Sequence, residues 1–416
     1  MTTEPTTPVP SRDVELILRG HPYRAIIRMA WPATASMLLH TLFAVVDMIW
    51  VGRLGAEPIA AVISAAFVVW ILFSLTSILT TGVVAMISRY LGAGDTDRAR
   101  AIAEESWRFG LILGVVIAAV GVGFREPIIG VMRLDPEVTR IGAAYLGVYF
   151  SAALFLLVDE WGSAVFRASG DTRTPLLVIS SALILNMVLD PLLIFGIGPF
   201  PRWEATGAAV ASVIAHLIAA ILFVIIIRRN RLPFPLHLRL IGPMNWRRIG
   251  RMVSIGVPIS VSGVVFCVVY LFVNRITAGF GTEAVAALGI GNRIESINYL
   301  VSFGFATATA ALVGQNLGAK NSERAAELVN KTIKLVSVFT GITAILFLVF
   351  PEVLIRFFVD DPNVVAAGKS YVRILALSQI LMGWEIVLEG AFSGAGDTMP
   401  PMLVSIPGSI ARIPLA

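Results

Sequence analysis

The segment LGAGDTDRA, residues 91–99, is repeated as LGAKNSERA at residues 317–325. The two copies are 226 residues apart, and the same shift aligns the two halves of the chain without a gap. Other matched pairs are Pro32 with Pro258, Gly55 with Gly281, Glu57 with Glu283, Asp135-Pro136 with Asp361-Pro362, Tyr145 with Tyr371, and Gly170-Asp171-Thr172 with Gly396-Asp397-Thr398. Self-similarity at one fixed period indicates an internal duplication. We therefore expect two equivalent halves.

The composition predicts that both halves lie in a membrane. Of 416 residues, 57% are hydrophobic and 14% are charged, whereas a soluble domain has about 25% charged residues. The mean hydropathy is +0.84. Eleven apolar segments are long enough to cross the bilayer as helices, at residues 26–50, 58–84, 104–124, 138–162, 174–197, 205–227, 253–274, 285–312, 332–350, 365–388 and 399–416. Since they lack the alternation of a membrane β-barrel, the fold class is an all-α polytopic membrane protein.

The repeat also predicts the domain organisation. Each copy holds six spans, so both copies enter the membrane in the same orientation, which is a parallel-topology repeat typical of transporters. We expect a tail at 1–25, a six-helix bundle at 26–227, a basic linker at 228–252 and a second bundle at 253–416. The shift places Ala416 on Asp190 and leaves nothing opposite residues 191–227. We therefore expect the second bundle to be truncated within its fifth helix, with the twelfth helix missing.

The distribution of positive charge predicts the orientation, because short cytoplasmic loops retain Lys and Arg. The N-terminal tail and every second loop hold 21 of the 32 Lys and Arg residues, and the alternate loops hold 9. This places the N terminus in the cytoplasm. The net charge of +5 then follows from topology, and the basic linker should face anionic lipid headgroups rather than nucleic acid.

Motifs for metal binding and soluble enzyme chemistry are absent from the sequence. Cys267 is the single cysteine, and the four His residues have no metal-ligand spacing. The sequence has no Gly-Lys-Ser/Thr phosphate loop, no His-Glu-x-x-His and no Gly-x-Ser-x-Gly. A membrane enzyme such as an acyltransferase would need a nucleophile or a His-acid pair at the membrane surface, which we do not find. We expect neither an enzyme nor a bound cofactor.

Ionisable residues inside the apolar spans predict a functional site, because each costs at least about 2.5 kcal/mol in the bilayer. Asp190 lies in LILNMVLDPLLIFG, and Asn186 lies one helical turn before it. Asp47, Tyr145 and Ser212 lie at a similar predicted depth in other spans of the first bundle. Pro191 has no N–H, so it leaves the carbonyl of Met187 without its helical partner.

These groups predict a cation site confined to the first bundle. Carboxylates, an amide, hydroxyls and a carbonyl are hard oxygen donors that suit Na⁺, and a carboxylate can carry H⁺ instead. The alternative is that Asp190 and Asn186 only bond neighbouring helices and that Asp47 reaches toward the membrane surface. The second copy holds Val273, Arg412 and Ala416 at the positions of Asp47, Asn186 and Asp190.

Two further charges, Arg293 and Glu295 in GIGNRIESINYL, lie within a span of the second bundle. They could neutralise each other. Alternatively, they could line the path of a substrate.

The chain resembles the multidrug and toxic compound extrusion (MATE) transporters. The resemblance is carried by WPATASMLLHTLFAVVDMIWVGRLG, VGQNLGAKNSERA, FRASGDTRTP, FSGAGDTMPP and NMVLDPLLIFG. It implies a monomer with two V-shaped six-helix bundles in a prokaryotic inner membrane. It also implies export of small amphipathic, often cationic compounds in exchange for inward H⁺ or Na⁺.

Within this family the chain is most similar to the branch of the DNA-damage-inducible protein F. The resemblance implies a cation site at Asp47, Asn186, Asp190 and Tyr145, with Ser212 standing where the branch has Thr. The NorM-like branch has an acid in its seventh helix, which GVPISVSGVVFCVVYLFVN lacks. The alternative function within the superfamily is a flippase of lipid-linked precursors, which would need a cationic cavity.

Overall fold

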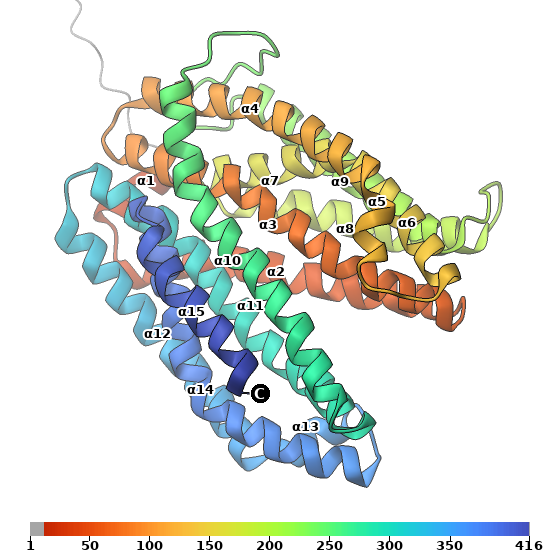
Figure 1. Cartoon of the computed structure of the whole chain (residues 1–416). Coiled ribbons are helices and arrows are strands. Elements are labelled where there is room, and N and C mark those ends of the chain that lie inside the picture. Colours follow the sequence, from red (N-terminus) through yellow and green to blue (C-terminus); the bar gives the residue numbers. More distant parts are fainter. Residues whose placement is uncertain (1–11, 416) are drawn as a thin grey trace, which may run out of the picture.

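The computed structural model describes residues 12–415, and this part of the chain is helical without strands (Figure 1). The helices of the first half are α1 (Arg12–Arg19), α2 (Pro22–Gly52), α3 (Ala56–Gly92), α4 (Thr96–Gly123), α5 (Arg125–Gly130), α6 (Pro136–Ser151), α7 (Ala153–Ala168), α8 (Arg173–Phe195) and α9 (Glu204–Arg228). Those of the second half are α10 (Trp246–Ala278), α11 (Thr282–Gly318), α12 (Ser322–Val349), α13 (Pro351–Arg356), α14 (Pro362–Ala395) and α15 (Met399–Leu415).

The helices follow the predicted duplication. The helices α11, α12 and α13 begin and end 226 residues after α3, α4 and α5. The short α5 and α13 both follow the third long helix of their half, at the same end of the molecule. This agreement confirms the predicted all-α fold built from a parallel repeat.

The spans differ from the sequence prediction at two places. Nine helices within residues 12–415 are long and apolar enough to cross a membrane, and a bent pair of helices brings the number to ten. The eleventh predicted span, 399–416, corresponds to α15, which has 17 residues and is shorter than those nine. Ala416 lies outside the described residues.

The bent pair is α6 and α7, which meet at 52° and replace the single predicted span 138–162. The Ser151 hydroxyl donates to the carbonyl of Val148 at 2.6 Å, which is the acceptor that the N–H of Ala152 would use in a continuous helix. Instead, the N–H of Ala152 donates to Tyr149 at 3.2 Å. The equivalent of Ser151 in the second half is Leu377, which has no hydroxyl, and α14 runs through without a break.

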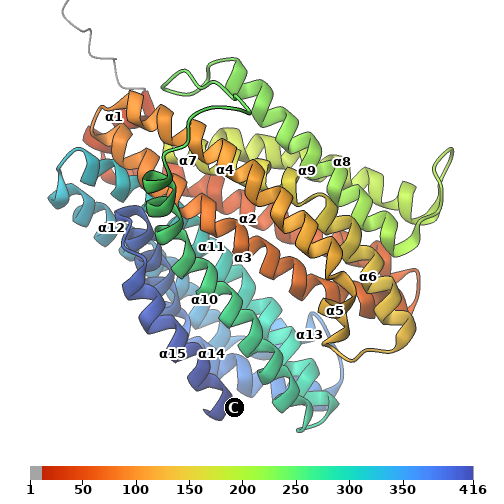
Figure 2. The ribbon, with the colours of Figure 1, turned by 45° about the horizontal axis from the view of Figure 1, so that its top comes forward.

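The two halves form two groups of helices in both views (Figures 1 and 2). The helices α4, α6, α7, α8 and α9 lie in one group, and α12, α14 and α15 lie in the other. Between them, α2 packs against α8 and α11, while α3 packs against α10 and α11. The boundaries at 26–227 and 253–416 stay predictions.

The halves approach most closely where the C-terminal ends of α3 and α11 cross. A Cβ atom on Gly92 would overlap the backbone of Gln315, and one on Gly318 would overlap the backbone of Arg89. These two contacts are related by the repeat, so the pseudo-twofold axis passes between them. Small residues allow membrane helices to approach in this way.

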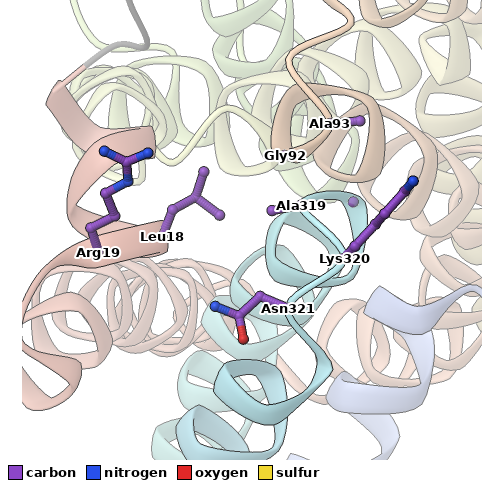
Figure 3. Close-up of a pocket in the computed structure, with 8 residues that line it drawn as sticks. Leu18, Arg19, Gly92, Ala93, Ala319, Lys320 and Asn321 are labelled. Atoms are coloured by element: carbon purple, nitrogen blue, oxygen red, sulfur yellow. The ribbon is translucent and has the colours of Figure 1, made fainter.

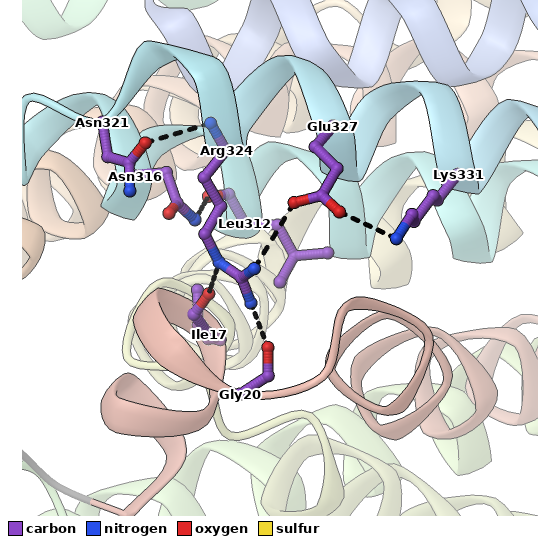
Figure 4. Close-up of polar contacts among 8 residues, drawn as sticks. All are labelled: Ile17, Gly20, Leu312, Asn316, Asn321, Arg324, Glu327 and Lys331. Carbon is purple, nitrogen blue, oxygen red and sulfur yellow. Dashed lines mark hydrogen bonds and ion pairs between the residues drawn. The ribbon is translucent and has the colours of Figure 1, made fainter.

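The helix α1 lies at the same end of the molecule, within the stretch predicted as a tail (Figures 3 and 4). Ile17 is fully buried against α2 and α11, and Asp13 pairs with Arg28 at 2.6 Å. From α12, Arg324 donates to the carbonyls of Ile17, at 3.3 Å, and Gly20 (Figure 4). A pocket separates α1 from the ends of α3 and α11, and it is lined by Leu18, Arg19, Gly92, Ala93, Gly318, Ala319, Lys320 and Asn321 (Figure 3). We call this end of the molecule the α1 side.

The basic linker is attached to α4 in addition to any contact with lipid. Arg248 pairs with the buried Glu105 at 2.6 Å. In return, Arg108 donates to the carbonyl of Pro243 at 2.8 Å. Part of the linker's positive charge is therefore satisfied within the protein.

We predict that Gly318→Ala destabilises the folded protein by about 1–3 kcal/mol, because the added methyl group overpacks a backbone contact. The matched control is Gly341→Ala in α12, where a Cβ atom meets nothing within 4 Å. Thermal unfolding of the detergent-solubilised protein checks this. Equal melting temperatures for the two variants would contradict the proposed crossing.

We also predict that Arg324→Gln loosens α1, because it removes the guanidinium that binds two of its carbonyls. Limited trypsin cleavage after the exposed Arg19 should become about tenfold faster if about 1.4 kcal/mol of local stability is lost. The control is Arg98→Gln at the equivalent position of the first half, where the Arg side chain is 67% exposed and pairs only with Asp95. Unchanged cleavage in Arg324→Gln would show that other contacts hold α1.

Candidate functional site

The two predicted carboxylates lie on different helices of the first half and are both buried. Asp47 is on α2 and is 8% exposed, and Asp190 is on α8 and is 0% exposed. They lie five residues before the ends of their helices, on the side opposite to α1. The helices α2 and α8 pack directly against each other, and the two carboxylates interact electrostatically. The structure therefore brings them into one site.

An amide and a hydroxyl complete this layer. Asn186, one turn from Asp190 on α8, is fully buried and donates to the hydroxyl of Ser212 on α9 at 3.4 Å. Tyr145 on α6 is buried and interacts electrostatically with both Asp47 and Asp190. All five predicted residues, Asp47, Tyr145, Asn186, Asp190 and Ser212, thus belong to one neighbourhood formed by α2, α6, α8 and α9.

The site has more acceptors than donors. Both carboxylate oxygens of Asp190, Oδ1 of Asp47 and Oδ1 of Asn186 are buried without a hydrogen-bond partner in the described chain. A buried acceptor that lacks a donor costs about 1–3 kcal/mol. Pro191 lies inside α8 and removes a donor to the carbonyl of Met187. A cation or proton would satisfy this set of oxygens.

The second half has no equivalent site. Val273 and Arg412 occupy the positions of Asp47 and Asn186, and the position of Asp190 falls on Ala416, outside the described residues. The guanidinium of Arg412 lies 5.7 Å from the ring centroid of Phe266. Oxygen ligands are therefore gathered in the first half only.

Arg293 and Glu295 do not pair with each other within residues 12–415. Arg293 is exposed, whereas Glu295 is half-buried and accepts from the amide of Gln379 at 3.2 Å. Gln379 in turn accepts from Asn298 at 2.6 Å. The expected neutralisation of one by the other is not seen, because residues two apart on a helix point in different directions.

Sequence reasoning missed two neighbours of the site, Tyr149 and His216. The ring of Tyr149 stacks on Tyr145 with centroids 5.8 Å apart, and it interacts with the hydroxyl of Ser212. Tyr149 also meets the ring of His216 edge to face at 6.4 Å. Each lies four residues after a predicted site residue on the same helix, and this spacing could have indicated them.

A structural metal site is absent from the described part of the chain, since no group of three His, Cys, Asp or Glu side chains there could hold an ion. The neighbourhood therefore offers oxygen ligands for a transported cation and no catalytic arrangement.

Comparisons with known proteins agree with this architecture. The MatE family model matches residues 32–192 and again residues 258–416. A probable multidrug resistance protein NorM from Thermotoga maritima is 30% identical over 396 residues, which are 94% of this chain and 84% of that protein. An FAD transporter from Shewanella oneidensis is 27% identical over 390 residues, covering 92% of this chain and 84% of the relative.

A solved structure has the same fold. It is described as the outward-facing conformation of a multidrug resistance MATE family transporter of the MOP superfamily. It matches with a TM-score of 0.89 and 25% identity, over 98% of this chain and 90% of that one. The second MatE match begins 226 residues after the first, at the shift of the internal repeat. The duplicated helical architecture, the matches to both halves and the transporter relatives together show that this chain belongs to the MatE family of multi-pass multidrug efflux transporters.

Proposed function

We propose that the protein is an antiporter that exports amphipathic cationic compounds, driven by H⁺ or Na⁺ that binds at Asp47, Asn186 and Asp190. The observation that carries this proposal is the set of buried, unpartnered oxygens shared by α2 and α8. If these residues were only helix contacts, their oxygens should find donors on neighbouring helices.

The same oxygens supply a way to couple ion and cargo. Two carboxylates in a low-dielectric layer repel each other, and a bound cation or proton removes that repulsion. The loaded and empty site should therefore favour different arrangements of α2 and α8. Coupling requires that the ion and the cargo prefer different conformations, and we propose that outward release of cargo follows loading of the site.

The distribution of charge favours cationic cargo. The two cations inside predicted spans of the second half, Arg293 and Arg412, are exposed, whereas Glu295 is half-buried. A flippase of lipid-linked precursors would need buried cations to bind pyrophosphate. One relative is named an FAD transporter, and FAD is anionic, so family membership alone does not fix the charge of the cargo.

The distribution of Lys and Arg supports an orientation with the α1 side in the cytoplasm of a prokaryotic cell. The cation site would then lie nearer the outer surface. Entry of the driving ion from outside would reach it over a short distance.

We predict that proteoliposomes containing the protein move a fluorescent cationic dye when an H⁺ or a Na⁺ gradient is imposed separately. Dye movement under one gradient alone names the driving ion. If neither gradient moves the dye while the protein is folded, the antiporter proposal is wrong, and translocation of a fluorescent pyrophosphate-linked lipid becomes the next assay.

We predict that Asp190→Asn and Asp47→Asn lower gradient-driven export at least about tenfold, the effect of losing about 1.4 kcal/mol of ion binding. Both variants keep a polar side chain of similar shape, so the protein should stay folded. The control is Glu126→Gln on α5, which removes an exposed carboxylate on the same side of the molecule. Export at the rate of the Glu126→Gln control in both variants would refute the site.

A further inference from the structure

A second buried polar cluster lies in the first half, between the cation site and the α1 side. Its centre is a 2.9 Å contact between Nδ1 of His216 on α9 and Oδ2 of Asp159 on α7. His40 on α2 interacts electrostatically with both of them and with Arg167, and Glu160 interacts with the same Asp, His and Arg. The cluster therefore joins α2, α7 and α9.

This cluster is continuous with the cation site. The ring of Tyr149 lies against His216 on one side, at 6.4 Å, and stacks on Tyr145 on the other, at 5.8 Å. Tyr149 also interacts with Ser212, whose hydroxyl accepts from Asn186. Hydroxyl and imidazole groups thus follow one another from the layer of Asp190 to Asp159.

The other end of the cluster reaches toward the α1 side. Arg167 lies in the last turn of α7. The next residue, Ala168, accepts a hydrogen bond at its carbonyl from Gln315 of α11, at the crossing of the two halves. Polar groups therefore extend from the ion site to the end of the bundle that the charge distribution assigns to the cytoplasm.

The cluster is not fully satisfied, as a purely structural network would be. Oδ1 of Asp159 and Nε of Arg167 are buried without partners in the described chain. Asp159 itself is 4% exposed. Titratable groups that face His216 are His40 from α2, Asp159, Glu160 and Arg167 from α7, and Tyr149 from α6, while α3 contributes the apolar ring of Phe73.

The cluster is specific to the half that holds the cation site. The positions of His40, Glu160 and Arg167 are occupied in the second half by Phe266, Ile386 and Ser393. The equivalent of Asp159 is Glu385, which is exposed. Since the duplication began with equivalent halves, the polar groups have been gathered where the ion site is.

We propose that His216 and Asp159 form a proton relay that connects the cation site to the α1 side. The inference rests on the proposed function and commits it to H⁺ as the driving ion. A proton released from the site binds Nε2 of the neutral imidazole, and the proton on Nδ1 passes to the Asp159 carboxylate. Loss of that proton to the α1 side and return of the imidazole to its first tautomer complete the cycle with no net change in the protein.

The relay makes a prediction that separates it from a structural role. His216→Gln and Asp159→Asn should slow export driven by an H⁺ gradient about tenfold, because proton discharge becomes limiting. Exchange of labelled for unlabelled dye without a gradient, which requires no net proton passage, should continue at the wild-type rate. The dependence of driven export on pH in the compartment facing the α1 side should flatten, and Asp159→Glu should restore part of the rate.

The experiment uses the full chain in proteoliposomes, with Glu385→Gln as the matched control at the repeat-equivalent position. Two relay variants are made because either could lose folded protein, which is checked by thermal unfolding. Driven export at the control rate in both variants would refute the relay, and so would a parallel loss of export and dye exchange. Export driven by Na⁺ alone would also refute it while leaving the proposed antiport intact, whereas no export by wild type under either gradient would refute the antiport itself.

Discussion

The crossing of α3 and α11 is the contact on which the arrangement of the two halves depends. Gly92 and Gly318 let the two backbones touch with no side chain between them, so the crossing has little room to slide. Because the contacts are reciprocal, each half meets the other through the same surface, as in an isologous interface. The same end carries α1, which is bound to α2 by Asp13 and to α12 by Arg324. Motion of the halves is therefore easiest at the opposite end.

Most of the fold could be predicted from the sequence because the duplication has one fixed period and the spans are strongly apolar. The break at Ala152 could not, since it depends on whether Ser151 or a backbone N–H binds the carbonyl of Val148. The docking of α1 was missed for a similar reason, because an eight-residue helix with a polar average is held by distant partners such as Arg324.

The candidate site shows the same division. Asp47 and Asp190 are conspicuous as charges in apolar spans, so their type and depth suffice to single them out. His216 and Tyr149 are ordinary residues in sequence, and only packing of α6 against α9 gives them a common neighbourhood. The opposite error occurred at Arg293 and Glu295, which are adjacent in sequence but differ in exposure and partners.

Helix α2 supplies a physical link between the cation site and the contact of the two halves. Asp47 faces α8, while Thr34, thirteen residues or about 20 Å earlier along the helix, lies against Gly304 of α11. Between the first turn and this contact, Pro32 frees the carbonyl of Arg28, which accepts from Thr172 at 3.5 Å. A helix held at both ends and weakened at a proline can bend there. Neutralising Asp47 would then change the force that α2 exerts on α11, so ion binding in one half reaches the other through a single helix.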